Sequence, residues 1–208
     1  TNRHKNGSLY YAAQTISPIK DEHGAISHYV SVSKDVTALV THTRELRQQA
    51  YHDALTGLLN RRAGETQLQL CSQNAQMRQS HYALILCDID NFKQVNDRFG
   101  HETGDHVLQR CASLLSASVR SGDTVVRWGG EEFLIILPDC PPSAALDLAE
   151  RIRSTVASHD DPVIGGFTIS LGVATSETIE DHTALLRKAD SALYACKRNG
   201  RNQALIAA

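Results

Sequence analysis

The sequence predicts an α/β (α+β) protein with a mixed central β-sheet flanked by helices. The run 82–87 is apolar throughout, which is typical of a central strand covered on both faces. The pair Gly129-Gly130 separates two further apolar runs, 125–126 and 133–137. It therefore predicts two strands joined by a tight hairpin in which both glycines take positive φ. Helical segments with one apolar face alternate with these strands, which favours a single sheet covered by helices.

The remaining elements follow from their apolar periodicity. One helix has Asp105 as its expected N-cap, and a second helix begins at Pro142-Ser143. A strand of alternating apolar residues, a last helix and a closing strand complete the predicted domain. The residues that define these elements are, in order, Leu108, Cys111, Leu115 and Val119; Ala145, Leu148, Ile152 and Val156; Phe167, Ile169, Leu171 and Val173; Leu186, Ala189 and Leu193; and 204–206.

The first 37 residues differ in character from the rest, and a linker follows them. Residues 9–19 and 26–36 are rich in β-branched and aromatic side chains and flank the turn signal 21–24, so they predict two strands. Two strands bury too little core to stand alone. Residues 38–51 contain neither Gly nor Pro and predict a helix. Its apolar side chains form a thin heptad seam, which fits a short parallel coiled coil and fits a solvated spacer helix nearly as well. The seam consists of Val36, Thr43 and Ala50 on one heptad position and of Leu39 and Leu46 on the other.

Two acidic motifs carry the chemistry that the sequence suggests. Asp88 and Asp90 follow the apolar run and lie two residues apart, so both side chains leave one face of an extended chain, and the Ile89 carbonyl is a further oxygen ligand. Glu131 and Glu132 follow the glycine pair at the edge of the sheet. Adjacent carboxylates repel each other unless a cation holds them, and Mg²⁺ prefers oxygen ligands of this kind. Solvated aspartates at a turn explain the first motif equally well on spacing alone.

Composition and charge exclude some classes of function. The formal net charge of −2 gives no global reason to expect binding to nucleic acid. The five cysteines are odd in number and lack CxxC spacing, so we expect reduced thiols in a cytoplasmic protein, with Cys87 and Cys111 in the core. No apolar run approaches the ~20 residues that cross a bilayer, so we expect no membrane contact within this sequence. The chain opens at Thr1, and a missing N-terminal part could anchor a longer protein to the inner membrane.

Five motifs in a fixed order resemble the GGDEF family of diguanylate cyclases, in its Gly-Gly-Glu-Glu-Phe form. The resemblance covers residues 53 to 206. The motifs are 53–62 (DALTGLLNRR), 88–97 (DIDNFKQVND), Phe99-Gly100-His101 with Gly104-Asp105, 129–133 (GGEEF), and Ala189-Asp190 with Tyr194, Lys197, Gly200, Arg201 and Asn202. Residues 1–37 resemble the last two strands of a PAS domain, which leaves 38–52 as a linker helix and 53–208 as the cyclase domain. The family's fold is similar to the palm of polymerases and to class III nucleotide cyclases.

The resemblance implies an activity and a set of roles. Two GTP molecules would be condensed into cyclic di-GMP and two pyrophosphates by a homodimer, with two Mg²⁺ (or Mn²⁺) ions in each active site. It implies metal binding by Asp88, the Ile89 carbonyl and Glu131, with Glu132 as a neighbouring ligand, and Glu131 is also the expected base. Lys93 would stabilise phosphate charge in transfer, and Phe92 belongs to the same substrate site. Gly129 and Gly130 would let the backbone approach the phosphates, while Lys197 and Arg201, four apart on the last helix, would hold the β- and γ-phosphates.

Guanine selection and control complete the expectation. Asn96 and Asp105, with His101 nearby, would read the base, because a carboxylate accepts from the N1–H and the amino group that adenine does not present. A structural interpretation makes Asn96 an ordinary helix residue and Asp105 only a cap. Arg120 and Asp123 form an RxxD motif that resembles the family's inhibitory site for the product, with Arg151 as a partner-side contact. The structural alternative for this motif is a surface turn before a strand.

Two other functions compete with cyclic di-GMP synthesis. One is a non-catalytic module that binds GTP or cyclic di-GMP, for which a damaged hairpin or a lost Asp88 would be expected, and the sequence has neither. The other is a cyclase with relaxed base choice, against which the retained Asp105 argues.

Overall fold

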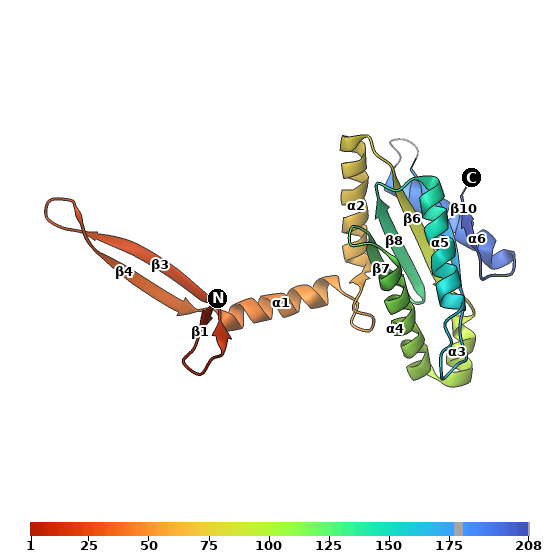
Figure 1. Ribbon diagram of the computed structural model, residues 1–208, viewed down its shortest axis with the longest axis horizontal. Coiled ribbons are helices and arrows are strands. Elements are labelled where there is room, and N and C mark those ends of the chain that lie inside the picture. The colour runs from red at the N-terminus through yellow and green to blue at the C-terminus, as the bar shows by residue number, and fades with distance from the viewer. Residues whose placement is uncertain (177–180, 208) are drawn as a thin grey trace. The chain divides into compact units, whose positions relative to one another are not determined.

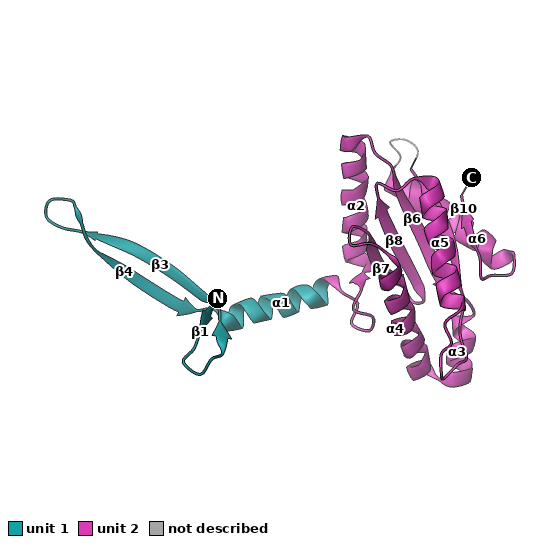
Figure 2. Cartoon of the chain, viewed as in Figure 1, with its two compact units in different colours: residues 1–50 teal, residues 51–208 magenta. Residues whose placement is uncertain are grey.

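The structure is a computed structural model that describes residues 1–176 and 181–207. The chain divides into two compact units, Thr1–Ala50 and Tyr51–Ala208, which Figure 2 shows in different colours. Among the described residues, no helix is long and apolar enough to cross a membrane. All five cysteines are free, and Cys87 and Cys111 are fully buried, as expected.

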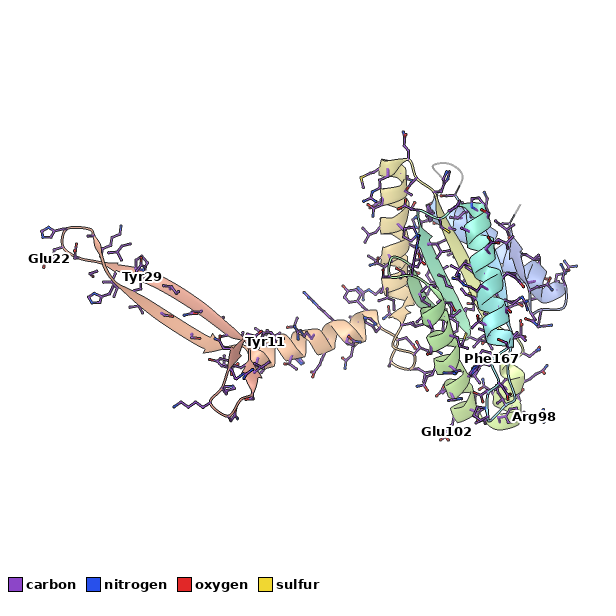
Figure 3. The ribbon with its side chains drawn as sticks, in the orientation of Figure 1. Tyr11, Glu22, Tyr29, Arg98, Glu102 and Phe167 are labelled. Atoms are coloured by element: carbon purple, nitrogen blue, oxygen red, sulfur yellow. The ribbon has the colours of Figure 1, made fainter. Side chains whose placement is uncertain are left out.

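The first unit is built from short strands and one helix. Strands β1 (Asn2–Arg3) and β2 (Leu9–Tyr10) pair with each other, and β3 (Ala12–Lys20) pairs with β4 (Ile26–Asp35) in a long antiparallel ladder. Apolar side chains of this ladder are exposed; Tyr29, labelled in Figure 3, is 66% exposed. Helix α1 (Thr37–Tyr51) follows, and none of its fifteen described residues is buried. The predicted strands and helix are therefore present, while the PAS origin of this unit and a coiled coil through α1 stay predictions.

The second unit contains a six-stranded mixed sheet with helices on both faces (Figure 1). The strand order is β10-β9-β6-β8-β7-β5; β6 pairs antiparallel with β8 and β9, and the β7–β8 pair is antiparallel too, while β10 is parallel to β9 and β5 to β7. This arrangement confirms the predicted mixed sheet. The elements are β5 (Leu59–Asn60), α2 (Arg61–Arg78), β6 (Tyr82–Ile89), α3 (Phe92–Phe99), α4 (His101–Ser118), β7 (Thr124–Gly129), β8 (Glu132–Pro138), α5 (Pro142–Ala157), β9 (Ile169–Thr175), α6 (His182–Arg198) and β10 (Ala204–Ile206).

Strand β6 forms the centre of the sheet and is buried along its whole length, as the apolar run predicts. Its side chains alternate between two cores because successive residues of a strand face opposite sides. Ala83, Ile85 and Cys87 pack in a core with residues of α4 and α5, while Leu84 and Leu86 pack in a second core with residues of α2 and α6. Strand β6 therefore holds the acidic residues at its end between two rigid layers.

Helix α6 lies close to the sheet because β9 carries a glycine at the contact. A Cβ atom on Gly172 would overlap the main chain of α6 at Ala189 and Leu193. Such an overlap involves backbone and could be relieved only by moving the helix. Gly172 thereby sets the distance between α6 and the central strands.

Several expected boundaries are wrong. Helix α4 begins at His101 after Gly100, whose φ is +86°, so Asp105 lies inside the helix and is not its N-cap. Helix α6 ends at Arg198, and Arg201, with φ of +64°, lies in the turn beyond it, so Lys197 and Arg201 are not one helical turn apart on a shared face. Phe167 precedes β9 and is not part of it. In the hairpin only Gly130 has positive φ, at +36°, whereas Gly129 continues β7 and pairs with Glu132.

Candidate active site

The sheet brings the two acidic motifs together. Asp88 on β6 lies directly opposite Glu132 on β8, so their side chains leave the same face. The Ile89 amide donates to the Glu131 carbonyl over 3.3 Å, which continues the pairing past the end of the strand. The tight β7–β8 hairpin thus carries both glutamates to the end of the central strand, as the sequence predicts.

Asp88 is held in an environment that disfavours its charge. Its side chain is 8% exposed, and burial raises its pKa to about 6. The value of about 6 is a balance, in which burial is the largest effect, the Lys197 ammonium lowers the pKa, and the neighbouring Glu131 and Glu132 carboxylates add to the rise. A further cation near Asp88 would therefore stabilise its ionised form.

Lys197 supplies the cation that Asp88 contacts. Its Nζ lies 2.7 Å from Asp88 Oδ2. Lys197 continues the row Leu185, Ala189 and Leu193, which are spaced four apart along one face of α6 and are buried in the core that it shares with α2. The same row that anchors α6 therefore delivers an ammonium group to the acidic end of β6.

Asp90 has a structural environment distinct from that of Asp88. Its carboxylate accepts hydrogen bonds from the Thr168 and Ser170 hydroxyls, both at 2.7 Å, and from the Asn202 amide at 3.0 Å. These donors come from the entry to β9, from β9 itself and from the turn after α6. Asp90 thus ties the end of β6 to β9 and to the turn after α6 through three hydrogen bonds.

The hairpin turn is anchored from one side by Arg127. Its guanidinium donates to the Gly130 carbonyl over 3.1 and 2.9 Å and to both carboxylate oxygens of Asp53 over 3.0 Å. Asp53 also accepts from the Thr56 amide and hydroxyl. Burial raises the pKa of Asp53, but these hydrogen bonds outweigh burial and leave the pKa below its usual range.

Helices α3 and α4 present the residues expected to read guanine. Asn96 of α3 packs directly over Gly104 of α4, where a Cβ atom would overlap the Asn96 amide oxygen. Asp105 follows Gly104, is exposed, and is not used as a cap. Asn96 and the exposed Asp105 therefore lie on two helices that pack against each other at Gly104.

The other expected substrate residues differ in their availability. Lys93 and His101 are exposed at the beginnings of α3 and α4. Phe92 is 8% exposed and its side chain packs in the core, so the ring is not available to a substrate. Arg201 is exposed in the turn after α6, so its direction is not set by the helix.

The donor set of this site fits a divalent cation that shares its ligands with a substrate. The described residues contain no group of three or more His, Cys, Asp or Glu side chains placed to hold a metal ion by themselves. The carboxylates of Glu131 and Glu132 nevertheless act on the charge of Asp88, and the Lys197 ammonium balances one negative charge. Mg²⁺ is commonly held by one or two carboxylates together with water and substrate phosphates. Asp88, Glu131 and a main-chain carbonyl are oxygen donors of that kind.

Comparison with known proteins identifies the family. Residues 50–203 match the family profile described as "Diguanylate cyclase, GGDEF domain". The chain belongs to the GGDEF family. Within it, the diguanylate cyclase DgcM of Escherichia coli is 43% identical over 177 residues, which cover 83% of this chain and 42% of DgcM. The chain therefore spans less than half the length of that relative.

Solved structures of GGDEF domains share this fold. The coiled coil and GGDEF domain of DgcB from Caulobacter crescentus, in complex with c-di-GMP, matches with a TM-score of 0.78 and 34% identity, over 83% of this chain and 93% of that one. The active GGEEF domain of a diguanylate cyclase from Vibrio cholerae matches with a TM-score of 0.70 and 35% identity, over 73% of this chain and 98% of that one.

The RxxD motif of this GGDEF domain forms a closed turn. The Arg120 side chain donates to Asp123 over 3.0 Å and to the Pro138 carbonyl over 2.6 Å. Asp123 is 4% exposed, whereas Arg120 is 61% exposed. Arg151 donates to the Ser118 carbonyl over 2.9 Å and shares a surface cavity with the motif. The structure therefore brings these three predicted residues together.

Two features of the GGDEF site escape the sequence argument. The Arg127–Asp53 pair joins positions 74 residues apart, and the Lys197–Asp88 pair joins positions still more distant. Neither shows any local spacing. The only available signal for the first pair is a lone arginine beside the hairpin glycines.

Proposed function

We propose that this chain is a diguanylate cyclase that condenses two GTP molecules into cyclic di-GMP and two pyrophosphates. The observation that carries the proposal is the convergence of Asp88 with Glu131 and Glu132 at one end of β6. The family membership and the names of the relatives support the same reaction. Because the chain covers less than half of DgcM, the activity is proposed from the domain's own residues.

The reaction is two nucleotidyl transfers of the same kind. A ribose 3′-oxygen forms a bond to the α-phosphorus of the other nucleotide, the bond from that phosphorus to the α,β-bridging oxygen breaks, and pyrophosphate leaves. The hydroxyl proton passes to a base, for which Glu131 is our candidate. A free glutamate is a weak base for an alcohol, with an ordinary pKa of about 4.3. A bound Mg²⁺ or Mn²⁺ would supply Lewis acidity toward the 3′-oxygen and charge balance for the leaving group.

Asp88, the Ile89 carbonyl and Glu131 would hold that metal, with Glu132 as an alternating ligand. We propose two ions per site, as the resemblance implies. Their ligand shells would be completed by phosphate oxygens and water, which agrees with the small number of protein carboxylates that converge here.

The protein's own cations and main chain would orient the triphosphate. Gly130 leaves the hairpin turn open on its outer side, because nothing lies within 4 Å of the position of a Cβ atom there. Lys93, at the start of α3, would neutralise phosphate oxygens in transfer. Lys197 in the last turn of α6 and Arg201 in the turn that follows would bind the β- and γ-phosphates, though not as neighbours on one helix.

Guanine would be selected between α3 and α4. Asp105 can accept from the N1–H and the amino group, and the Asn96 amide both donates and accepts. A buried base that leaves such partners unpaired is rejected, because each unmade hydrogen bond costs about 1–3 kcal/mol. Adenine offers no donor at these positions.

The reaction would need two chains, because each domain presents one such site. Exposed Leu39 and Leu46 of α1 are available for a parallel contact between copies. The relative DgcB was solved with a coiled coil beside its GGDEF domain, which supports this arrangement. The specific rate should therefore rise with protein concentration through the dimerisation range, and a constant specific rate contradicts a dimeric mechanism.

Incubation of the chain with Mg²⁺ and GTP, and separately with ATP, followed by mass spectrometry of the products, tests the function. We expect cyclic di-GMP and pyrophosphate from GTP alone. A product from ATP alone refutes the assignment of the base pocket, and binding of GTP without any product favours a non-catalytic module. Glu131→Gln should abolish synthesis, while the matched control Glu102→Gln, an exposed acid in the first turn of α4, should not.

A further inference from the structure

The Lys197–Asp88 ion pair conflicts with the roles that the proposed function gives to its members. The function assigns Asp88 to a metal ion and Lys197 to the triphosphate. In the structure, the Lys197 ammonium lies 2.7 Å from Asp88 Oδ2 and therefore occupies the approach that a cation would use. If the ammonium kept this contact, it would face a divalent cation at the same carboxylate, and the two positive charges would repel each other.

The charge balance at the end of β6 explains why the pair forms. Asp88 is 8% exposed and lies opposite Glu132, with Glu131 beside them. A buried carboxylate that faces two others needs a counter-ion, because an uncompensated buried charge is strongly unfavourable. Lys197 provides that counter-ion from within the chain.

The placement of Lys197 also lets it leave. The preceding residues of its row, Leu185, Ala189 and Leu193, are fixed in the core, and Gly172 holds α6 against the sheet. Lys197 itself is in the last turn of α6, and its side chain is 35% exposed. The helix therefore fixes the base of a long flexible side chain whose end can move between the buried acid and the solvent side.

We propose that Lys197 is an exchangeable counter-ion, which neutralises Asp88 while the site is empty and transfers to the triphosphate when a metal–nucleotide complex enters. This inference rests on the proposed function and adds to it the order in which Lys197, the metal ion and the phosphates exchange partners. The ammonium leaves Asp88 as the divalent cation arrives, and the incoming phosphates give the ammonium a new partner. Free Mg²⁺ gains little from the site alone, because it must separate an existing ion pair without supplying that partner.

The exchange predicts opposite effects of one substitution on two ligands. In Lys197→Met, Asp88 is unpaired, so Mg²⁺ should bind the nucleotide-free protein about tenfold more tightly, the equivalent of ~1.4 kcal/mol. GTP in the presence of EDTA should bind the same variant about tenfold more weakly, because a phosphate partner is lost. A merely structural role for Lys197 would not separate the two ligands in this way.

The experiment is a pair of calorimetric titrations, one with Mg²⁺ alone and one with GTP in EDTA, on the wild-type chain and its variants. Arg198→Met is the matched control, because Arg198 is the next residue and its guanidinium lies 5.9 Å from the centroid of the Tyr194 ring. It should change neither affinity. Asp88→Asn provides a second variant that does not depend on the folding of Lys197→Met, and it should strengthen GTP binding in EDTA several-fold by releasing Lys197.

The outcomes separate the exchange from the function on which it rests. If wild type and Lys197→Met bind Mg²⁺ equally, or the variant binds it more weakly, the exchange is refuted while the metal site stands. If GTP binding in EDTA is unchanged in both Lys197→Met and Asp88→Asn, the transfer to phosphate is refuted. If neither wild type nor Lys197→Met binds Mg²⁺, the exchange is refuted, while a metal site completed by substrate phosphates still stands.

Discussion

Arg127 joins the turn of the β7–β8 hairpin to Asp53, with its guanidinium 3.0 Å from both oxygens of that carboxylate and 2.9 Å from the Gly130 carbonyl. Both side chains are largely covered, at 18% and 22% exposure. Asp53 lies just after α1, in a turn where the Gly57 amide donates to the Asp53 carbonyl. The hairpin that carries Glu131 is therefore held by the segment that opens the GGDEF domain.

Removal of this anchor should lower both stability and rate. Arg127→Met leaves the partly buried Asp53 carboxylate without its ion pair, so we expect the free energy of unfolding to fall by about 1–3 kcal/mol. The rate of cyclic di-GMP formation should fall further than stability alone explains, because the hairpin turn loses two hydrogen bonds. Urea unfolding and initial rates measure the two effects. Glu65→Gln, in the exposed Arg61–Glu65 pair, is the control and should stay within about 0.5 kcal/mol of wild type.

A methyl group at Gly104 should disturb guanine recognition more than folding. The Cβ atom in Gly104→Ala would overlap the end of the Asn96 side chain, which can move away, and not the main chain. We expect kcat/KM for GTP to fall on the order of tenfold, the cost of one lost hydrogen bond. Combined with Asn96→Ala, the substitution should add nothing further. Additive losses in the double variant would place the effect of Gly104→Ala elsewhere.

Asp88 should give the metal-free protein a pH-dependent stability of defined sign. Its pKa is raised from 3.8 to about 6, so between these values the folded protein holds a proton that the unfolded chain releases. The stabilising contribution is fully present below pH 3.8 and is lost as the pH rises through about 6. The free energy of unfolding of wild type, measured from pH 4 to 7 and compared with Asp88→Asn, should decline by about 2–3 kcal/mol more in wild type. Parallel curves for the two proteins would show that the pKa is not raised.

Arg120 should be required for inhibition by cyclic di-GMP and not for synthesis. Its guanidinium is 61% exposed while held by Asp123, so it is oriented for a ligand at the surface. Arginine can bind the O6 and N7 edge of guanine bidentately, a contact worth about 1–3 kcal/mol. Initial rates with Arg120→Ala should match wild type, and the inhibition constant should rise at least about tenfold. An unchanged inhibition curve removes the regulatory role. Arg187→Ala, an exposed arginine of α6, is the control.

Local patterns predicted the elements of this domain better than their ends. The apolar run of β6 and the glycines of the β7–β8 hairpin define those strands because burial and turn chemistry act within a few residues. Asp105 was misplaced because Gly100 begins α4 one turn earlier than a side-chain cap would. The expectation that Lys197 and Arg201 share a helical face is wrong because α6 ends at Arg198. Gly200, with φ of +104°, takes the chain out of the helical conformation before Arg201.

The contacts that decide chemistry were beyond the reach of sequence periodicity. Asp90 resembles Asp88 in the sequence, yet its three hydrogen-bond donors come from residues 168, 170 and 202. The strand order places β9 beside β6, so Asp90 bonds to residues at β9. Asp88 instead carries the ion pair with Lys197. Neither this difference nor the Lys197 pairing follows from any spacing along the chain.

The central claim is that Asp88 and Glu131 meet around a divalent cation that also binds GTP. The most direct measurement is the anomalous diffraction of Mn²⁺ in crystals grown with Mn²⁺ and α,β-methylene GTP, a nucleotide that cannot lose pyrophosphate. We predict a Mn²⁺ peak about 2.0–2.3 Å from carboxylate oxygens of both residues, with Lys197 moved from Asp88 to the phosphates. A bound nucleotide with no Mn²⁺ near either acid, and with Lys197 still on Asp88, would contradict the account.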